Sequence, residues 1–412
     1  MEHRHPRILV VSQHYWPENF RITDICKGFT EHGAEVDVLC GLPNYPKGEW
    51  FEGYSYRGPR RQTHEGVQIF RAGEVPRRGN TAARIFLNYV SWPLFALFSL
   101  PRLHGRRYDA VFCYETSPVL MMVPAIVYAK LHRVPLCTYV LDLWPENLYS
   151  VLPVKNRALR AVAAGVSHWL YRRSDRLVGM SEALCEKLRA IAPKRQVYAV
   201  PQYCEDLYAQ DVHDAALAAR FAGRFCVVFA GNISPAQDLG LLVECAVRLA
   251  RAGRTDIHFC IVGDGMSRAQ LEQQIVAAGV QDYFTFEGMQ PVERIPAYHT
   301  MAGALFAALA KSDDLGLTVP AKITSYMAAG RPCLVAADGE AARAVVQAGC
   351  GLACAAGDAD ALYANLISLA DMPAEARAAL GRAGRACFNR HYRRSLLLQR
   401  LMACILGQQS AE

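Results

Sequence analysis

The sequence predicts an α/β fold built from two doubly wound domains. Short apolar runs rich in β-branched residues alternate with longer helical patterns, which is typical of parallel sheets covered by helices on both faces. This alternation starts twice, once at Ile8–Ser12 and again at Phe225–Gly231. The length of 412 residues fits two domains, each of about 200 residues.

The apolar runs give the position of each predicted strand. In the first half the strands are expected at residues 8–11, 36–40, 67–71, 110–114, 136–141, 176–179 and 197–200. In the second half they are expected at residues 225–230, 258–262, 284–287, 304–307 and 333–336. We expect domains at 1–205 and 206–385, followed by a C-terminal segment at 386–412. Residues 388–406 predict one amphipathic helix that packs on its own domain or crosses back to the first.

The composition favours a cytoplasmic globular protein. Hydrophobic residues make up 52% of the chain and charged residues 20%, so each domain can bury a sizeable core. The 14 cysteines are scattered without a C-x-x-C pair, which favours reduced thiols over a disulfide framework or a zinc site. No signal peptide precedes the strand at residues 8–11, and no apolar run reaches the ~18–20 residues of a membrane span.

Positive charge is concentrated in the first half. Residues 1–205 hold 27 Lys and Arg against 18 Asp and Glu, whereas the remainder holds 18 against 20. Arginine clusters flank two apolar runs, residues 89–100 and 119–129, a pattern that suits an anionic membrane surface. The expected contacts are Trp92, Phe95, Leu97 and Phe98. Solvated arginines are the simpler alternative, and nucleic acid is not expected because aromatic and basic residues are not interleaved.

The stretch Lys311–Pro332 predicts a helix that begins at an anion site. Thr318 can cap the helix, Pro320 suits its first turn, and Gly330 can end it. Free N–H groups and the positive dipole end favour an anion there. Lys322 in the first turn is unfavourable against the dipole unless an anion binds. The alternative is an ordinary surface lysine on a capped helix.

Three further loops fall at the same predicted sheet edge in the second half. They follow the strands at residues 225–230, 258–262 and 284–287. Glycine followed by polar residues lets the backbone approach a diphosphate, although Gly-Asp-Gly is also a common turn. Their candidate residues are Gly231, Asn232, Gln237, Gly263, Asp264, Gly265, Met289, Gln290 and Val292.

The first half has its own ligand-side loops. The loop after residues 8–11 is rich in polar and aromatic side chains, and Asn19 is expected to cap the helix that follows. Asp142 is expected at the carboxyl end of a strand, where a carboxylate can orient a sugar hydroxyl or take its proton. Helix capping is the alternative role for Asp142. The candidate residues of these loops are His14, Trp16, Glu18, Asn19, Arg21, Asn44, Asp142, Trp144 and Glu146.

The order of these motifs resembles retaining GT-B glycosyltransferases of family 4. In the second half the motifs are Gly231-Asn-Ile233, Val262–Gly265, Phe286–Gly288 and Pro320–Pro332. The first-half motifs Tyr15–Arg21, Gly41–Pro46, Asp142–Glu146 and Pro201–Tyr208 are similar to one bacterial branch, the O-antigen, capsule and colanic-acid transferases, which includes L-fucosamine transferases. The resemblance covers nearly the whole chain.

This resemblance implies two facing Rossmann-like domains and a defined reaction. The second domain would bind a UDP-sugar and the first an undecaprenyl-diphosphate-linked acceptor, in an enzyme peripheral on the inner face of the bacterial cytoplasmic membrane. Transfer would retain the anomeric configuration, with the leaving diphosphate helping to deprotonate the acceptor hydroxyl. No metal is expected, because no Asp-x-Asp motif follows a suitable strand; Asp358-Ala-Asp360 starts a predicted helix.

The chain departs from the family pattern at the donor side. Asn232 and Gln237 stand where many members carry Arg and Lys. The usual glutamate pair is missing: counting back from Gly330 puts Leu317 and Ser325 in those places, whereas aligning on Gly316 puts Asp313 at the first. Ser325 is expected to hydrogen-bond a ribose hydroxyl. We expect Lys322 to supply the diphosphate charge that Gln237 lacks.

The resemblance assigns roles to the candidate residues. Asp142, Glu18 and Lys322 would serve catalysis. Donor binding would use Gly231, Asn232, Gln237, Gly263, Asp264, Gly265, Met289, Gln290, Val292, Asp313, Leu317, Thr318, Pro320, Ala321 and Ser325. Acceptor binding would use His14, Trp16, Asn19, Arg21, Asn44, Trp144 and Glu146. Two alternatives stay open: a sugar-nucleotide 2-epimerase of the same fold, and a non-catalytic glycosyltransferase-like subunit that binds a partner.

Overall fold

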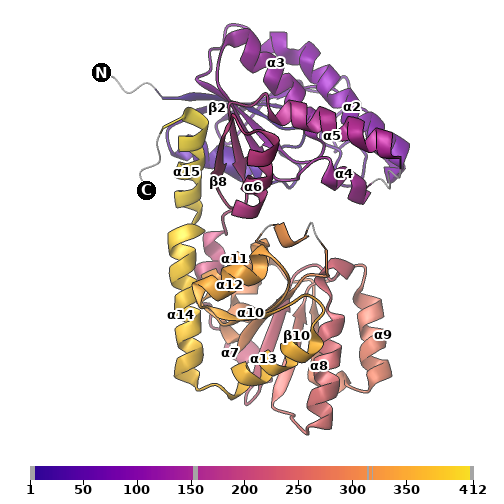
Figure 1. Ribbon diagram of the computed structural model, residues 1–412, viewed down its shortest axis with the longest axis vertical. Helices are drawn as coiled ribbons and strands as arrows, with labels where there is room; N and C mark the ends of the chain where they lie inside the picture. Colours follow the sequence, from indigo (N-terminus) through magenta and orange to yellow (C-terminus); the bar gives the residue numbers. More distant parts are fainter. Residues whose placement is uncertain (1–4, 152–155, 313–314, 318, 409–412) are drawn as a thin grey trace. The chain divides into compact units, whose positions relative to one another are not determined.

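The computed structural model describes residues 5–151, 156–312, 315–317 and 319–408. The chain divides into two compact units (Figure 1). Unit 1 holds the chain up to Val200 together with the segment from Leu398 onward, and unit 2 runs from Pro201 to Leu397. Each unit is an α/β domain with its own sheet, as predicted.

Unit 1 contains an eight-stranded sheet in the order β3-β4-β2-β1-β5-β6-β7-β8. All neighbouring strands are parallel except β3 and β4. The strands are β1 (Arg7–Val11), β2 (Glu35–Cys40), β3 (Arg61–His64), β4 (Val67–Arg71), β5 (Ala110–Glu115), β6 (Leu136–Val140), β7 (Arg176–Gly179) and β8 (Gln196–Ala199). The helices are α1 (Ile22–Glu31), α2 (Ala82–Ser99), α3 (Met122–His132), α4 (Glu146–Val151), α5 (Arg157–Tyr171) and α6 (Glu182–Ile191).

Unit 2 contains a six-stranded, fully parallel sheet in the order β11-β10-β9-β12-β13-β14. The strands are β9 (Phe225–Ala230), β10 (Ile257–Val262), β11 (Phe284–Gly288), β12 (Ala304–Ala308), β13 (Cys333–Ala336) and β14 (Gly351–Cys354). The helices are α7 (Ala215–Arg220), α8 (Gly240–Arg251), α9 (Arg268–Ala278), α10 (Ile295–Met301), α11 (Ala321–Ala329), α12 (Glu340–Ala348), α13 (Ala359–Asp371) and α14 (Ala374–His391).

Helices cover both faces of the unit 2 sheet. Val228 on β9 belongs to one core cluster, whereas its neighbours Val227 and Phe229 belong to the cluster on the opposite face. Because side chains alternate along a strand, continuous burial of β9 requires both faces to be covered. This explains why the apolar runs predicted strands so directly. The predicted strands are all present within a residue or two of their expected ends.

The order of strands defines where each unit offers a ligand edge. In unit 1 the chain runs outward from β1 through β2 and returns to β5 on the other side of β1. In unit 2 it runs outward from β9 through β10 and returns to β12. Parallel sheets bind ligands beyond the carboxyl ends of the strands at such reversals. The candidate loops therefore converge at the carboxyl ends of β1 and β9.

The prediction of one continuous helix over residues 388–406 was wrong. Residues 388–406 form parts of two helices, because α14 ends at His391 and α15 (Arg394–Leu406) begins three residues later. The carbonyl of Tyr392 accepts a hydrogen bond from Cys204 N (3.0 Å), and Arg393 pairs with Cys204 as an isolated parallel bridge. This pairing takes the backbone out of the helix and interrupts it.

Two capping predictions also differ from the structure. Helix α1 has Arg21 as its N-cap without a side-chain hydrogen bond, so Asn19 does not cap it. Helix α11 begins at Ala321 with Pro320 as its N-cap residue, one position earlier than a first-turn proline. Thr318 lies outside the described residues. Gly330 ends α11 in the left-handed region (φ 67°), as predicted.

Helix α2 begins seven residues before the apolar run at residues 89–100 that the sequence indicated. Together with the short turn Leu100–Leu103, it is the one helix among the described residues long and apolar enough to cross a membrane. Trp92 is fully buried, so the expectation that it contacts a membrane was wrong. Phe95 and Phe98 are 43% and 82% exposed. One side of α2 therefore packs on unit 1 and the other is apolar and open to solvent.

Candidate active site

Lys322 lies at the start of α11, and its side chain reaches the end of β9. Its Nζ donates a hydrogen bond to Gln237 Oε1 (2.5 Å) and lies 3.7 Å from the centroid of the Phe229 ring. A Cβ at Gly231 would come within 3.0 Å of this Nζ, so the glycine leaves room for the lysine. Burial lowers the pKa of Lys322 to about 7. Among the described residues, no charged group contributes to this shift.

Tyr326 fixes the helix that carries Lys322. The Tyr326 hydroxyl donates to Phe306 O (2.9 Å) on β12 and accepts from Ala230 N (3.4 Å) on β9. Residues four apart lie on the same face of a helix. Tyr326 therefore holds Lys322 over the end of β9, where the strand order reverses.

The loops after β9 and β10 are joined by backbone hydrogen bonds. Ile233 N donates to Asp264 O (2.9 Å), and Ser267 N donates to Ile233 O (3.1 Å). A Cβ at Gly265 would lie 2.2 Å from Ile233 O, so only glycine permits this close approach. The Val262–Gly265 motif thus holds two ligand-side loops together.

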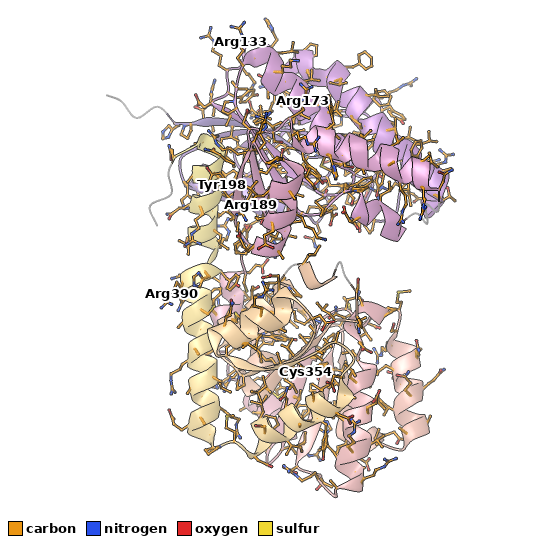
Figure 2. The ribbon with its side chains drawn as sticks, viewed as in Figure 1. Arg133, Arg173, Arg189, Tyr198, Cys354 and Arg390 are labelled. Carbon is orange, nitrogen blue, oxygen red and sulfur yellow. The ribbon has the colours of Figure 1, made fainter. Side chains whose placement is uncertain are left out.

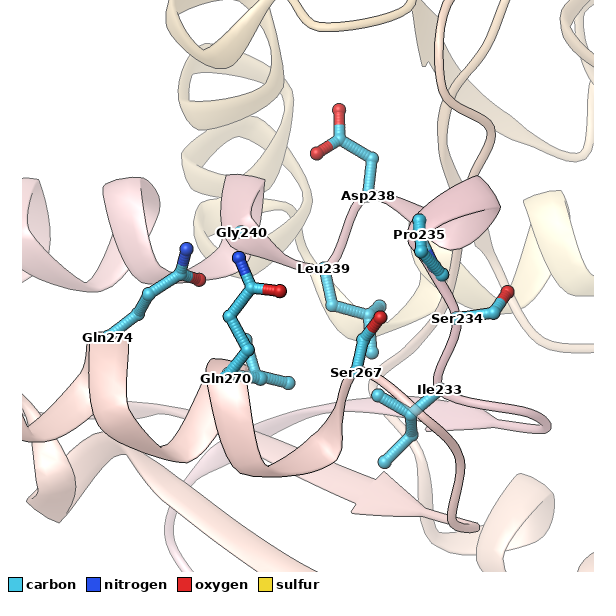
Figure 3. Close-up of a pocket in the computed structure, with 10 residues that line it drawn as sticks. Ile233, Ser234, Pro235, Asp238, Leu239, Gly240, Ser267, Gln270 and Gln274 are labelled. Carbon is cyan, nitrogen blue, oxygen red and sulfur yellow. The ribbon is translucent and has the colours of Figure 1, made fainter.

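A pocket of about 240 Å³ lies beside the same loop (Figure 3). Ser234 and Asp238 line it from the loop after β9. Ser267, which precedes α9, and Gln270 and Gln274 on α9 line the other side. In Figure 3 both glutamine amides extend from α9 toward the start of α8. Hydroxyl and amide groups of this kind suit a ligand rich in hydroxyl groups. The sequence did not predict these side chains, since serine and glutamine are common on helix surfaces.

Three predicted donor-binding side chains have partners within unit 2. Asp264 accepts from Gly265 N (2.7 Å) and Arg268 Nη1 (3.3 Å), and Gln290 Nε2 donates to Glu287 O (2.6 Å). Ser325 Oγ donates to Lys322 O (2.8 Å). Ser325 therefore has only its acceptor lone pairs left for a ligand. A ribose hydroxyl would have to donate to it.

The other predicted donor-binding residues lie around this cluster on the same loops. Asn232, Met289 and Val292 are exposed, and Leu317 closes a short turn (Leu315–Leu317) ahead of α11. Pro320 and Ala321 form the start of α11. Asp313 lies outside the described residues.

In unit 1, Glu18 holds the first loop and the second together. Glu18 Oε2 accepts from His14 Nδ1 (2.9 Å), and its Oε1 accepts from Asn44 N (2.8 Å) and Tyr45 N (2.7 Å). Glu18 and His14 are buried, and the His14 ring stacks on Phe20. Both carboxylate oxygens of Glu18 are thus occupied by the protein itself. This geometry makes Glu18 a positioning residue for His14 and the Asn44 loop.

A second buried carboxyl group, Glu74, lies behind this loop and was missed by the sequence. It accepts hydrogen bonds from Gln13 Nε2 (2.6 Å), Asn88 Nδ2 (2.9 Å) and Asn44 Nδ2 (3.0 Å). Burial, followed by the charge of nearby Glu18, raises the pKa of Glu74 to about 8. Glu74 and its three partners come from separate segments of the chain, which meet only in the folded unit. No local sequence motif could therefore indicate this site.

Ser117, in the loop after β5, organises the predicted acceptor side. Its Oγ donates to Asp142 Oδ2 (3.0 Å) and accepts from Trp144 Nε1 (3.2 Å) and Asn147 Nδ2 (2.8 Å). Burial raises the pKa of Asp142, and hydrogen bonds from Ser117 and Asn147 oppose that rise. Asp142 therefore follows β6 as predicted, with its carboxyl group tied to the neighbouring loop. Helix α4 begins only at Glu146.

Tyr89 on α2 lies between these two groups of residues. The Arg77 guanidinium is 5.1 Å from the Tyr89 ring, and the Trp144 ring packs edge-on at 5.9 Å. Arg77 also donates to Asn88 Oδ1 (3.0 Å), and its Nη2 lies 3.5 Å from His14 Nε2. His14 and Asp142 therefore belong to one continuous network of contacts at the carboxyl edge. Arg77 and Tyr89 are additional candidate ligand contacts.

The remaining predicted acceptor residues are placed at the margins of this network. Trp16 stacks on His64 with 4.1 Å between ring centroids, which turns it toward β3. Arg21 is the N-cap residue of α1, and its charge acts on the buried Tyr114 and Tyr139 hydroxyls. Glu146 starts α4. Among the residues that the structure describes, no three His, Cys, Asp or Glu side chains are grouped as a metal site.

The geometry defines two chemical settings. Unit 2 offers a partly buried lysine amino group at a helix start beside a strand reversal, an arrangement that can stabilise a diphosphate. Unit 1 offers carboxyl, imidazole and aromatic groups, which can orient hydroxyl groups and stack on a sugar ring. Both settings lie at carboxyl edges of parallel sheets.

Two family models match the chain, one in each unit. The model described as "Glycosyl transferase 4-like domain" matches residues 19–202, and the one described as "Glycosyl transferases group 1" matches residues 218–386. A curated relative, the 2-deoxystreptamine glucosyltransferase of Streptomyces kanamyceticus, is 27% identical over 302 residues, which is 69% of this chain and 73% of the relative.

Solved structures agree on the fold. Sucrose-phosphate synthase from Thermosynechococcus elongatus superposes with a TM-score of 0.71 at 15% identity, covering 99% of this chain and 100% of that one. HepE of Anabaena in complex with UDP superposes with a TM-score of 0.68 at 14% identity, covering 98% and 100%. The two sheets and these superpositions define the GT-B fold.

The chain belongs to the group 1, or family 4, glycosyltransferases. It is an enzyme that transfers a sugar from a nucleotide-sugar donor.

Proposed function

We propose that this glycosyltransferase transfers a sugar from a UDP-sugar to an undecaprenyl-diphosphate-linked acceptor during assembly of a bacterial surface polysaccharide. The branch resemblance of the Tyr15–Arg21 and Asp142–Glu146 motifs supports this choice, and an N-acetylated deoxyhexosamine such as L-fucosamine is the proposed sugar. The enzyme would work at the inner face of the cytoplasmic membrane. The observation that carries the donor half is the partly buried Lys322 amino group held beside Gln237.

The donor assignment is supported by the charge balance around Lys322. A buried cation with neutral neighbours is unfavourable until an anion binds. The resemblance places Gln237 where many members of the family carry a basic residue, and the Lys322 amino group is hydrogen-bonded to that glutamine. We infer that Lys322 and the first backbone amides of α11 bind the diphosphate, while Met289–Val292 lie near the base.

The membrane assignment is supported by the open face of α2. Phe86, Leu87, Leu94, Phe95 and Phe98 are all more than 40% exposed on this helix. Arginines at both ends of the helix, Arg84 and Arg102, are exposed as well. An apolar face bordered by cations is suited to the headgroup region of an anionic bilayer. Such a surface would bring the enzyme to a lipid-linked acceptor.

A transfer assay tests the proposal. Purified protein is given UDP-sugars or GDP-sugars together with a polyprenyl-diphosphate-linked sugar, and product is followed by mass spectrometry. We expect glycosylated lipid only with a UDP-sugar. Conversion of donor without acceptor would instead identify a 2-epimerase. Absence of product with every donor, restored by a partner protein, would contradict the proposed stand-alone activity.

A second candidate acceptor comes from the curated relative, whose name gives 2-deoxystreptamine as the acceptor. Asp142 at the end of β6 is the observation that favours it, because a carboxylate can pair with an ammonium group of an aminocyclitol. The same assay with 2-deoxystreptamine decides between the two. Transfer to this soluble acceptor at a rate above that of the lipid would favour the second candidate.

A further inference from the structure

Helix α5 carries an apolar stripe that unit 1 leaves uncovered. Leu159, Val162, Val166 and Trp169 are 59%, 63%, 42% and 50% exposed, and we call these four residues the α5 stripe. Their spacing of three, four and three residues places them on one face of the helix. Ser167, Leu170 and Tyr171 are the buried residues of α5. The helix thus exposes more large apolar side chains than it buries.

The charges around the α5 stripe have one sign. Residues 157–173 contain four arginines and no Asp or Glu. The Arg173 guanidinium, labelled in Figure 2, lies 4.7 Å from the Trp169 ring, and Arg172 Nε donates to Ile191 O (2.7 Å). Tryptophan beside arginine at the end of an apolar helix face is characteristic of a membrane interface.

We propose that the α5 stripe lies on an anionic bilayer surface, with Trp169 at the level of the headgroups and the arginines at the lipid phosphates. The positive charge of this helix indicates what binds to the α5 stripe. An anionic lipid surface complements residues 157–173, whereas a second copy of α5 in a two-fold dimer would set arginines against arginines. In Figure 1, α5 and α2 lie on the side of unit 1 away from α15.

This inference rests on the membrane assignment of the proposed function and adds a second contact surface to it, but it depends on neither the donor nor the acceptor. It also differs from the α2 surface, since α5 is a separate helix with its own exposed residues and its own arginines. Single exposed valines elsewhere, such as Val346 on α12, have no such stripe around them. Val346 and Val162 are both 63% exposed, which makes them a matched pair for an experiment.

The test is co-sedimentation of the full chain with vesicles of phosphatidylethanolamine and phosphatidylglycerol. We expect the double variant Leu159→Asp/Val162→Asp to bind roughly tenfold more weakly. Each change removes an apolar side chain that would enter the bilayer, and it puts a negative charge next to the anionic lipid. The control Val346→Asp should bind as the unchanged protein does. UDP binding and circular dichroism confirm that each variant is folded.

A second measurement locates the contact without weakening it. Vesicles with brominated acyl chains should quench tryptophan fluorescence in the unchanged protein. In Trp169→Phe, binding should persist while most of this quenching disappears, since phenylalanine keeps the stripe apolar. Equal quenching in Trp169→Phe and the unchanged protein would overturn the proposal.

Two other results would also overturn it. If only the α2 variant Phe98→Asp weakens vesicle binding and the α5 double variant does not, the membrane contact belongs to α2 alone. If sedimentation velocity shows a dimer that the α5 double variant disperses, the stripe is an interface between copies of this chain. Donor transfer activity distinguishes either result from a failure of the proposed function, because it is measured with soluble donor and detergent-dispersed acceptor.

Discussion

Lys322 Nζ donates to Gln237 Oε1 across 2.5 Å, which joins the start of α11 to the loop after β9. The amide oxygen orients the ammonium group but brings no charge to balance it. A ligand diphosphate would therefore meet an amino group that is already held in place, and little reorganisation of the side chain would accompany binding. This relationship underlies the first two predictions.

Lys322→Ala should weaken binding of a UDP-sugar by roughly tenfold to a hundredfold, the loss of one charge-assisted contact of about 1.5–3 kcal/mol. Isothermal titration calorimetry measures it. The control is Lys311→Ala, an exposed lysine at the loop that leads to α11. Adding Gln237→Lys to Lys322→Ala should recover part of the affinity, because it returns a positive charge to the place where the two side chains now meet. Unchanged affinity in Lys322→Ala would contradict the donor assignment.

Donor binding should take up a proton above neutral pH. Burial sets the pKa of Lys322 at about 7 in the free enzyme, and a bound diphosphate favours the charged form and raises that pKa. Affinity should therefore be constant at lower pH and fall as pH rises through and beyond 7. Calorimetry at pH 8 in buffers of different ionisation enthalpy measures how many protons are taken up when the donor binds. An intact UDP-sugar is the right ligand, because its diphosphate does not titrate there. The Lys322→Ala variant should show no uptake.

Glu74 should make unit 1 less stable as pH rises. Because the pKa of Glu74 is about 8 in the folded protein, the carboxyl group stays protonated well above pH 4.5, the ordinary pKa of a glutamate. Between these values the folded state binds more protons than the unfolded state, so the free energy of unfolding falls with rising pH, by on the order of a few kcal/mol. The contribution of Glu74 to the free energy of unfolding is fully present below pH 4.5 and is lost as the pH rises through about 8. Glu74→Gln should flatten this slope in urea denaturation. An identical slope in both proteins would show that another group titrates.

Phe98→Asp should reduce binding to anionic vesicles while leaving the fold intact. Phe98 is 82% exposed, so its replacement should change the free energy of unfolding by only about 0.5 kcal/mol. Trp92, on the buried side of the same helix, behaves differently: Trp92→Ala should cost about 3–5 kcal/mol through loss of core packing. Thermal denaturation and vesicle flotation separate the two effects. Full vesicle binding by Phe98→Asp would exclude the α2 face as a contact.

The sequence was most informative where strands are buried on both faces. Runs such as Phe225–Ala230 are continuous and apolar, because helices cover both sides of the sheet. It missed β3 and β14, which lie at sheet edges and lack such runs: β3 reads Arg-Gln-Thr-His, and β14 begins with glycine. The break between α14 and α15 was also missed, since it depends on Cys204, nearly two hundred residues earlier.

The candidate site could be predicted at the level of loops but not of contacts. Strand ends converge at one edge by topology, so the neighbourhood of Gly231 and Lys322 was foreseeable. The pairing of His14 with Glu18 and the hub at Ser117 were not, because they depend on side-chain directions across loops. Trp92 illustrates the same difficulty, since its burial depends on how α2 is rotated about its axis.

The segment from Leu398 returns to unit 1, where Leu401 and Ile405 are buried and Ile405 O accepts a hydrogen bond from Arg176 Nη1 (2.9 Å). During synthesis, this part of unit 1 emerges only after the whole of unit 2. The first domain therefore stays incomplete while the second folds. Arg176 on β7 lacks this hydrogen bond until Ile405, more than two hundred residues later, has been synthesised. A ribosome-bound chain that stops before Leu398 should expose this apolar site to chaperones, even though all eight strands of its sheet are already present.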